Sequence, residues 1–230
     1  MTEPASALEL VISADPGLYA IVGLSLAVSL GATLLATLTG APLGALIALG
    51  RFPGRQVVVV MFNALMGLPP VVVGLAVYLL LSRSGPLGEL GMLFTPAAMV
   101  VTQTILVLPI IAALTRQTIE DLWLEYRDEF AAMGVGPLRR LRTLLWDARF
   151  SLVTAVLAGF GRAAAEVGSI IIVGGNIEGY TRTMTTTIAL ETSKGNLPLA
   201  MGLGMILLTI VLAVNVAAWG VRQIGARFER

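Results

Sequence analysis

Apolar residues dominate five long stretches of this 230-residue chain, and polar residues gather between them. Each stretch reaches about 20 residues, the length that an α-helix needs to cross the roughly 30 Å hydrocarbon core of a bilayer. None shows the alternation of a β-barrel strand. The predicted spans cover residues 18–49, 57–81, 96–114, 151–173 and 199–221. The pattern therefore predicts an all-α integral membrane protein with about five transmembrane helices, in a single domain over residues 1–230.

Composition agrees with a chain that meets lipid, because 57% of its residues are hydrophobic and only 13% are charged. A soluble domain carries roughly 25% charged residues. The absence of cysteine and histidine excludes thiolate nucleophiles, imidazole metal ligands and histidine-based triads. A net charge of +1 argues against a nucleic-acid partner, which would require a visibly basic chain. We therefore expect a membrane protein that is not an enzyme and binds no metal.

The basic residues are divided unequally between the two sides of the predicted spans, eleven against three. The eleven are Arg51, Arg55, Arg116, Arg127, Arg139, Arg140, Arg142, Arg149, Arg222, Arg227 and Arg230, and the three are Arg83, Arg182 and Lys194. The positive-inside rule places the richer side in the cytoplasm, with the N-terminus outside and the C-terminus inside. The N-terminal segment holds Glu3, Glu9 and Asp15 but no basic residue, unlike a signal peptide. We expect a multi-pass protein of the cytoplasmic (inner) membrane.

Small residues and prolines interrupt several of the predicted spans. Gly40 and Gly44 flank Pro42 in the first span, a pattern that permits a close helix crossing and a kink. Pro69-Pro70 in the second span and Pro109 in the third leave backbone carbonyls that other groups must satisfy. These features indicate packed or moving helices, and by themselves they identify no function.

The most polar segment, about 116–150, connects the third and fourth predicted spans. Its apolar residues recur at helical intervals as far as Met133, and residues 134–137 then interrupt the pattern as a helix cap and restart would. Leucines among Arg139, Arg140 and Arg142 indicate a second amphipathic helix. Two interpretations stay open: a solvated loop whose arginines only set topology, or a docking element whose apolar stripe needs a partner.

Residues 128–134 read Asp-Glu-Phe-Ala-Ala-Met-Gly, which resembles the cytoplasmic EAA loop of ATP-binding-cassette importer permeases. The glycine and its spacing match, whereas Asp128 replaces the usual glutamate and Trp146-Asp147 stands where the family has Leu-Pro. In that family the loop forms a coupling helix, which contacts a cytoplasmic ATPase. The resemblance implies ATPase contact by Asp128, Glu129, Phe130, Ala131, Ala132, Met133, Gly134 and Arg139.

Polar residues at membrane depth are the candidates for a translocation path. Arg162 and Glu166, four residues apart on one helix face, form either a structural ion pair or an anion-guiding arginine held by its carboxylate. Gln103 either forms an interhelical hydrogen bond or lines a pore. Thr185 and Thr186 belong to a threonine cluster whose hydroxyls either donate to an oxyanion or cap a helix.

Several segments resemble the molybdate/tungstate branch of these importers: Gly161-Arg162-Ala163, Glu166-Val167-Gly168, Gly174-Gly175-Asn176-Ile177 and residues 66–74. Residues 181–192 are most similar to tungstate permeases. The resemblance implies transport of an oxyanion, tungstate first, with molybdate and sulfate as alternatives.

The energy source for transport lies outside this chain. A P-loop needs Gly-Lys followed by Ser or Thr, and the only lysine, Lys194, lies between Ser193 and Gly195. This chain therefore holds no cofactor, and ATP and magnesium belong to a partner. Five spans also favour a homodimer with its pore at the two-fold interface. The resemblance implies a second permease copy, an ATPase dimer and an extracytoplasmic solute-binding protein.

The alternative is a secondary, ion-coupled anion transporter without an ATPase partner. Such proteins usually contain internal repeats and intramembrane carboxylates that couple transport to ions. No repeat is evident in the sequence, and Glu166 alone qualifies as such a carboxylate.

Overall fold

The computed structural model describes residues 16–228, apart from the side chains of residues 221, 222 and 224–228. The acidic residues Glu3, Glu9 and Asp15 and the side chains of Arg222, Arg227 and Arg230 therefore lie outside the described part. Within it the chain forms helices and no strand. These are α2 (Pro16–Leu49), α3 (Arg55–Leu65), α4 (Pro70–Leu81), the 3₁₀ helix η1 (Gly88–Leu90), α5 (Pro96–Ala132), α6 (Pro137–Asp147), α7 (Arg149–Ala164), α8 (Gly168–Gly174), α9 (Met184–Lys194) and α10 (Leu197–Phe228).

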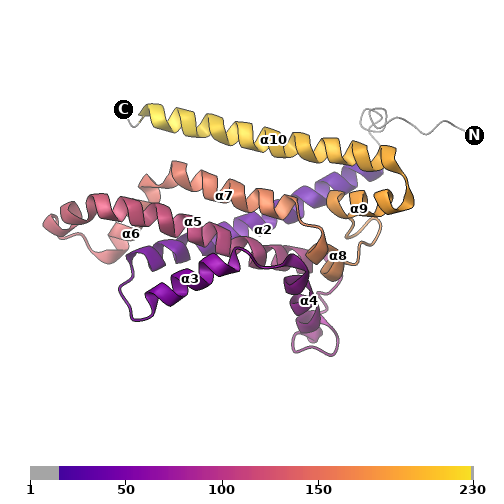
Figure 1. The fold of residues 1–230 in the computed structure, drawn as a ribbon, viewed down its shortest axis with the longest axis horizontal. Helices are drawn as coiled ribbons and strands as arrows, with labels where there is room; N and C mark the ends of the chain where they lie inside the picture. The colour runs from indigo at the N-terminus through magenta and orange to yellow at the C-terminus, as the bar shows by residue number, and fades with distance from the viewer. Residues whose placement is uncertain (1–15, 229–230) are drawn as a thin grey trace, which may run out of the picture.

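Helices α2, α5, α7 and α10 run along the longest axis of the molecule (Figure 1). Helices α2 and α5 both run from the end near α9 toward the end near α6, α7 returns, and α10 runs toward the α6 end again. The first and last described helices thus begin and end at opposite ends, as an odd number of crossings requires. The prediction of an all-α membrane protein is confirmed.

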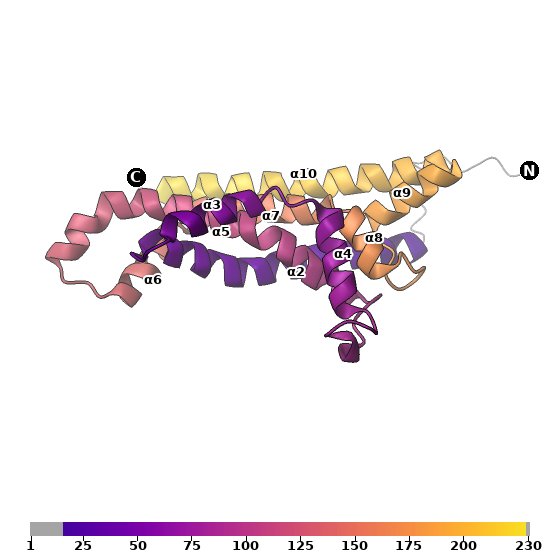
Figure 2. The same cartoon turned by 60° about the horizontal axis from the view of Figure 1, so that its bottom comes forward.

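Three described helices, α2, α5 and α10, are each long and apolar enough to cross a membrane alone. The count rises to five when each of two bent pairs, α3 with α4 and α6 with α7, is taken as one span. The predicted span over residues 57–81 is not one straight helix, because α3 and α4 meet at 101° where the sequence places Pro69-Pro70. Pro70 at the start of α4 lacks the N–H that a continued helix would need, and Pro69 disfavours helical backbone before it. Helix α4 consequently points away from the bundle (Figures 1 and 2).

Two further boundaries differ from the prediction. The helix of the third predicted span does not end at residue 114: α5 continues without a break to Ala132 and includes the first part of the predicted loop 116–150. The fourth span over residues 151–173 is also not continuous: α7 ends at Ala164 and α8 begins at Gly168. At this break the carboxylate of Glu166 accepts the Ser169 N–H at the start of α8.

The crossing of α2 and α5 forms the centre of the bundle, and it depends on the small residues that the sequence indicated. A Cβ on Gly44 would overlap the carbonyl oxygen of Ala112 and lie 3.0 Å from the Cβ of Thr115. A Cβ on Gly40 would lie 3.1 Å from the carbonyl oxygen of Leu108. The prediction of a close helix crossing is confirmed, since neither position has room for a side chain.

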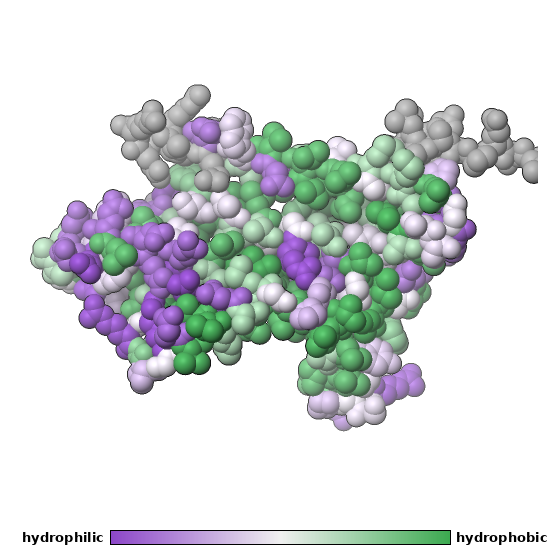
Figure 3. Space-filling view, in the orientation of Figure 1, coloured by the Kyte–Doolittle hydropathy of each residue, from purple (hydrophilic) through white to green (hydrophobic). Residues whose placement is uncertain are grey.

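Hydrophobic and hydrophilic side chains separate along the molecule (Figure 3). Strongly hydrophilic residues crowd the end formed by the α5–α6 turn, whereas hydrophobic residues cover much of the middle. Large apolar side chains are exposed on α2 and α10, including Leu34, Leu38, Leu208 and Leu212. This distribution suits a protein whose middle faces lipid and whose α6 end faces the cytoplasm.

Candidate functional site

The turn between α5 and α6 has a defined backbone geometry that explains its glycine. Gly134 adopts a φ of 61°, in the left-handed region. The Val135 N–H donates to the Phe130 carbonyl and the Gly134 N–H to the Ala131 carbonyl, at 3.1 and 3.2 Å. These two bonds, with Val135 packed in the same apolar cluster as Phe130, form a Schellman cap. The predicted helix cap and restart are confirmed.

A small apolar core supports this turn at the hydrophilic end of the molecule. It contains Ala45 and Ala48 from α2, Ile119 and Phe130 from α5, and Leu144 from α6. Trp123 packs against this core and stacks on Phe130, with ring centroids 6.2 Å apart. The α5–α6 hairpin is therefore an ordered projection with its own packing, which a merely solvated loop would lack.

Seven of the eight predicted ATPase-contact residues are exposed on this projection. They are Asp128, Glu129, Ala131, Ala132, Met133, Gly134 and Arg139. Phe130 is the exception, since its side chain is buried in the supporting core. The exposed residues of this projection are thus acidic, basic, small and flexible apolar, and Phe130 packs beneath them.

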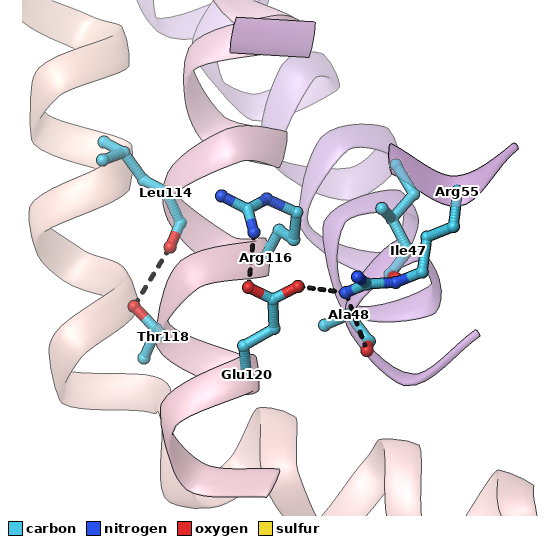
Figure 4. Close-up of polar contacts among 7 residues, drawn as sticks. All are labelled: Ile47, Ala48, Arg55, Leu114, Arg116, Thr118 and Glu120. Atoms are coloured by element: carbon cyan, nitrogen blue, oxygen red, sulfur yellow. Dashed lines mark hydrogen bonds and ion pairs between the residues drawn. The ribbon is translucent and has the colours of Figure 1, made fainter. Parts of the chain in front are cut away.

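An ion-pair network ties this projection to the rest of the bundle (Figure 4). Glu120 of α5 accepts from Arg55 at the start of α3 and from Arg116, one turn earlier on α5. The Nε of Arg55 also donates to the Ile47 carbonyl at 2.8 Å, and its Nη2 donates to the Ala48 carbonyl at 3.3 Å. Arg55 thereby caps the last turn of α2 while it binds α5.

Sequence reasoning used Arg55 and Arg116 only to orient the protein and did not identify this network. The spacing of Arg116 and Glu120, four residues apart on one helix, was the available signal. The contact with Arg55, 65 positions away, depends on how α2, α3 and α5 pack.

The predicted pair of Arg162 and Glu166 lies at the junction of α7, α8 and α9. Arg162 Nη1 lies 2.9 Å from Glu166 Oε2, and Glu166 Oε1 accepts the Ser169 N–H at 3.0 Å. The hydroxyl of Thr185 donates to the Glu166 carbonyl at 2.8 Å. Both carboxylate oxygens are thus engaged and Glu166 is buried, while the Arg162 side chain keeps 29% of its surface exposed. This geometry is that of a structural ion pair, and an additional role of Arg162 in transport stays a prediction.

The threonine cluster forms the N-terminal cap of α9. The Thr183 side chain accepts a backbone N–H of the first turn, and Thr186 Oγ1 accepts the Thr183 N–H at 3.0 Å, which completes a capping box. Ser25 of α2 accepts the Met184 N–H at 2.7 Å and so joins α9 to the first span. The hydroxyls of Thr185 and Thr186 are therefore committed to contacts within the chain, as the capping alternative requires.

Gln103 lies on α5 and is buried, with its Nε2 donating to the Ala163 carbonyl of α7 at 2.9 Å. Its Oε1 has no hydrogen-bond partner among residues 16–228. Gln103 lines a cavity of about 20 Å³, room for a single water, which Ser29 and Glu166 also line. Gln103 thus forms the predicted interhelical hydrogen bond, and the structure brings it to the same cavity as Glu166 and Thr185.

A bundle of spanning helices with an ordered, capped helix–turn–helix projecting from its basic end has the architecture of a membrane permease subunit. No protein-family model matches the chain. It is 42% identical over 217 residues to a probable anion ABC transporter permease protein of Haloferax volcanii, covering 92% of this chain and 90% of the relative. It is 37% identical over 218 residues to a tungstate uptake system permease protein of Peptoclostridium acidaminophilum, covering 95% and 96%. The corresponding protein of Campylobacter jejuni is 38% identical over 72% of this chain and 69% of the relative.

The chain therefore belongs to the permease proteins of ABC transporters. Its relatives are transport subunits, and their family together with the apolar helices makes it a multi-pass protein of the cytoplasmic (inner) membrane. Sulfate transport permeases are more distant, at 24% identity for the protein of Salmonella typhimurium.

Proposed function

We propose that this chain is the membrane subunit of an ATP-driven oxyanion importer and that its oxyanion is tungstate. The proposal rests on two relatives named as tungstate uptake permeases, at 37% and 38% identity, against 24% for a sulfate permease. In this arrangement two copies of the chain form the pore within the bilayer, and a solute-binding protein delivers the anion from outside. A cytoplasmic ATPase dimer binds ATP and magnesium and contacts the α5–α6 projection.

The observation that best supports an ATPase-coupled mechanism is that α5 is long and continuous. Its 37 residues make a helix about 55 Å long at 1.5 Å per residue, whereas the hydrocarbon core is roughly 30 Å thick. The helix therefore extends well beyond the lipid as one rod, and its tip carries the exposed residues Ala131, Ala132 and Met133. A partner that displaces this tip moves a helix that crosses the membrane.

Close packing at several positions transmits such a displacement to other spans. Gly44 of α2 lies against Ala112 of α5, and Gly159 of α7 leaves so little space that a Cβ there would lie 2.8 Å from Val107. Arg55 connects α5 to α3 through Glu120. Because tightly packed helices move as units and do not deform continuously, motion of α5 carries α2, α3 and α7 with it.

The test is reconstitution of the chain with its ATPase and binding protein, with tungstate uptake and ATP hydrolysis measured on the same vesicles. We expect uptake only with ATP and all three components, and we expect Ala131→Glu and Ala132→Glu to abolish it. Ser84→Glu is the matched control, because Ser84 is exposed at the opposite end of the protein. Uptake without the ATPase would instead establish an ion-coupled secondary transporter.

The choice of oxyanion is tested separately, by calorimetry of tungstate, molybdate and sulfate on the binding protein and by competition in the uptake assay. Uptake of sulfate in preference to tungstate would overturn the substrate assignment while leaving ATPase coupling intact. Arg162→Gln, with assembly checked by co-purification, tests whether this side chain guides the anion. Normal uptake by that variant would restrict Arg162 to its structural ion pair.

A further inference from the structure

A groove of about 730 Å³ lies at the hydrophilic end of the bundle, between the end of α2, the extension of α5 and the start of α6. Three arginines from different parts of the chain line it: Arg51 after α2, Arg127 on α5 and Arg140 on α6. Asp128 is the only acidic residue in its lining and pairs with the Nε of Arg127 at 3.5 Å, so the groove carries a net charge of +2. Its remaining walls are largely apolar and include Leu46, Leu49 and Leu138.

The arginines keep hydrogen-bond donors free for a ligand. Arg51 is exposed and forms no hydrogen bond or ion pair among the described residues. Arg140 uses its Nε on the Val135 carbonyl, at 2.6 Å, and lies over the Trp123 ring, at 5.6 Å from its centroid. Both Nη groups of Arg140 stay available, held in position by these two contacts. Guanidinium groups with free donors around one groove can bind a phosphate through charge-assisted hydrogen bonds.

The apolar wall of the groove continues as a stripe on the lipid-facing side of α2. At 100° per residue, Leu35, Leu38, Leu46 and Leu49 fall within about 80° of one another around the helix. Leu35, Leu38 and Leu46 are exposed by 45%, 63% and 55%. From Leu35 to Leu49 the stripe is about 21 Å long, which exceeds one leaflet of a roughly 30 Å hydrocarbon core. Leu46 belongs both to this stripe and to the groove.

We propose that this groove binds the headgroup of an anionic phospholipid of the cytoplasmic leaflet, with the acyl chains lying along the leucine stripe of α2. Positive charge, free guanidinium donors and an apolar track that leads along α2 occur together at the basic end of the bundle, the side that the positive-inside rule places in the cytoplasm. A free anion would bind the arginines but would make no contact with the leucine stripe. A neutral lipid would pack against the leucine stripe, but the net positive charge of the groove would not strengthen its binding.

The site adds to the proposed transport function and does not depend on it. It lies beside the predicted ATPase-contact surface, since Asp128 and Ala131 belong to both. A lipid held there fills the space between α2 and the α5–α6 projection, and so supports the projection from the membrane side.

The test is native mass spectrometry of the full-length chain, delipidated in detergent and titrated with dioleoyl phosphatidylglycerol. We expect one retained lipid, and about 30-fold weaker binding when Arg51→Gln and Arg127→Gln are combined, because each arginine contributes about a fivefold gain near an anionic surface. Arg83→Gln with Arg142→Gln is the matched control: it removes the same charge from exposed positions outside the groove. This control should bind the lipid as the wild type does.

Two further probes distinguish the ligand source. Phosphatidylcholine should bind at least tenfold more weakly than phosphatidylglycerol, and millimolar inorganic phosphate should not displace the lipid. Leu46→Asn should weaken phosphatidylglycerol binding although every arginine is retained. Displacement by phosphate would show a free-anion site instead, and equal binding of both lipids, or equal losses in the control variant, would overturn the proposal.

Discussion

The turn at Gly134 allows a direct test of why this position is a glycine. Its φ of 61° is unfavourable for any residue with a Cβ, yet a Cβ built there meets no atom within 4 Å. Gly136, two residues later, also has open space, but its φ is −71°. Alanine at the two positions therefore adds the same atom to the same turn, and the variants differ only in backbone strain.

The expected magnitude follows from this difference. Left-handed backbone costs an L-residue roughly 1–2 kcal/mol, whereas Gly136→Ala keeps an ordinary extended conformation and costs no strain. A loss of 1–2 kcal/mol changes the ratio of closed to open turn by a factor of about 5–30. Gly134→Asn should fall between the two alanine variants, because asparagine tolerates the left-handed region better than alanine.

Hydrogen–deuterium exchange on the purified permease measures this ratio directly. The N–H groups of Gly134 and Val135 donate the two cap bonds, so their exchange reports opening of the turn. We expect Gly134→Ala to accelerate exchange in peptides covering residues 130–147 about 5–30-fold, and Gly136→Ala to leave it near the wild-type rate. Equal acceleration in both alanine variants, or none in Gly134→Ala, would refute the argument from backbone conformation.

Gly134→Glu extends the test to coupling with the ATPase. Since a Cβ at Gly134 meets no atom within 4 Å, a glutamate there starts in open space and shares the backbone strain of the alanine variant. Any loss of uptake beyond that of Gly134→Ala therefore measures bulk and charge against a partner surface. Identical uptake by the two variants would place the whole effect in the turn and none in the predicted contact.

Three other predictions concern the bundle. Gly44→Ala should lower the free energy of unfolding by about 1–3 kcal/mol through overpacking against Ala112, measured by thermal unfolding, while Gly23→Ala in the same helix, with open space, should not destabilise. Glu120→Gln should cost about 1–2 kcal/mol, because it leaves partly buried arginines unpaired, and additivity with Arg55→Gln in a double-mutant cycle would contradict a direct contact. Hydrogen bonds from Lys194 and then Asn196 lower the pKa of Glu191 below its ordinary value of 4.5, outweighing the opposing effect of burial. Its stabilisation relative to Glu191→Gln should therefore be complete above pH 4.5 and disappear as the pH falls through the lowered pKa, and a difference in melting temperature that persists at the acid end would contradict the assignment.

Local chemistry explains which parts of the fold and of the candidate site were predictable. The left-handed cap at Gly134 and the close crossing at Gly40 and Gly44 depend on residue types that permit few alternatives. The break in the fourth span was not predictable from the same kind of pattern. An apolar run through residues 168–174 follows Glu166, and only the folded chain shows that α7 ends at Ala164 and that this carboxylate bonds the first turn of a separate α8.

The sequence by itself determined that this protein lies in a membrane and which family it belongs to, and it predicted the orientation. Hydrophobic run lengths, the distribution of arginines and the residues around Gly134 are properties of the chain read in order, so they need no tertiary structure. Tertiary structure decided which polar groups meet. Arg55 reaches Glu120, the hydroxyl of Thr185 turns to the Glu166 carbonyl, and Arg51 shares a groove with Arg140 because helices far apart in sequence pack side by side. Such contacts depend on helix direction and rotation, which packing of the whole bundle fixes and a linear pattern does not encode.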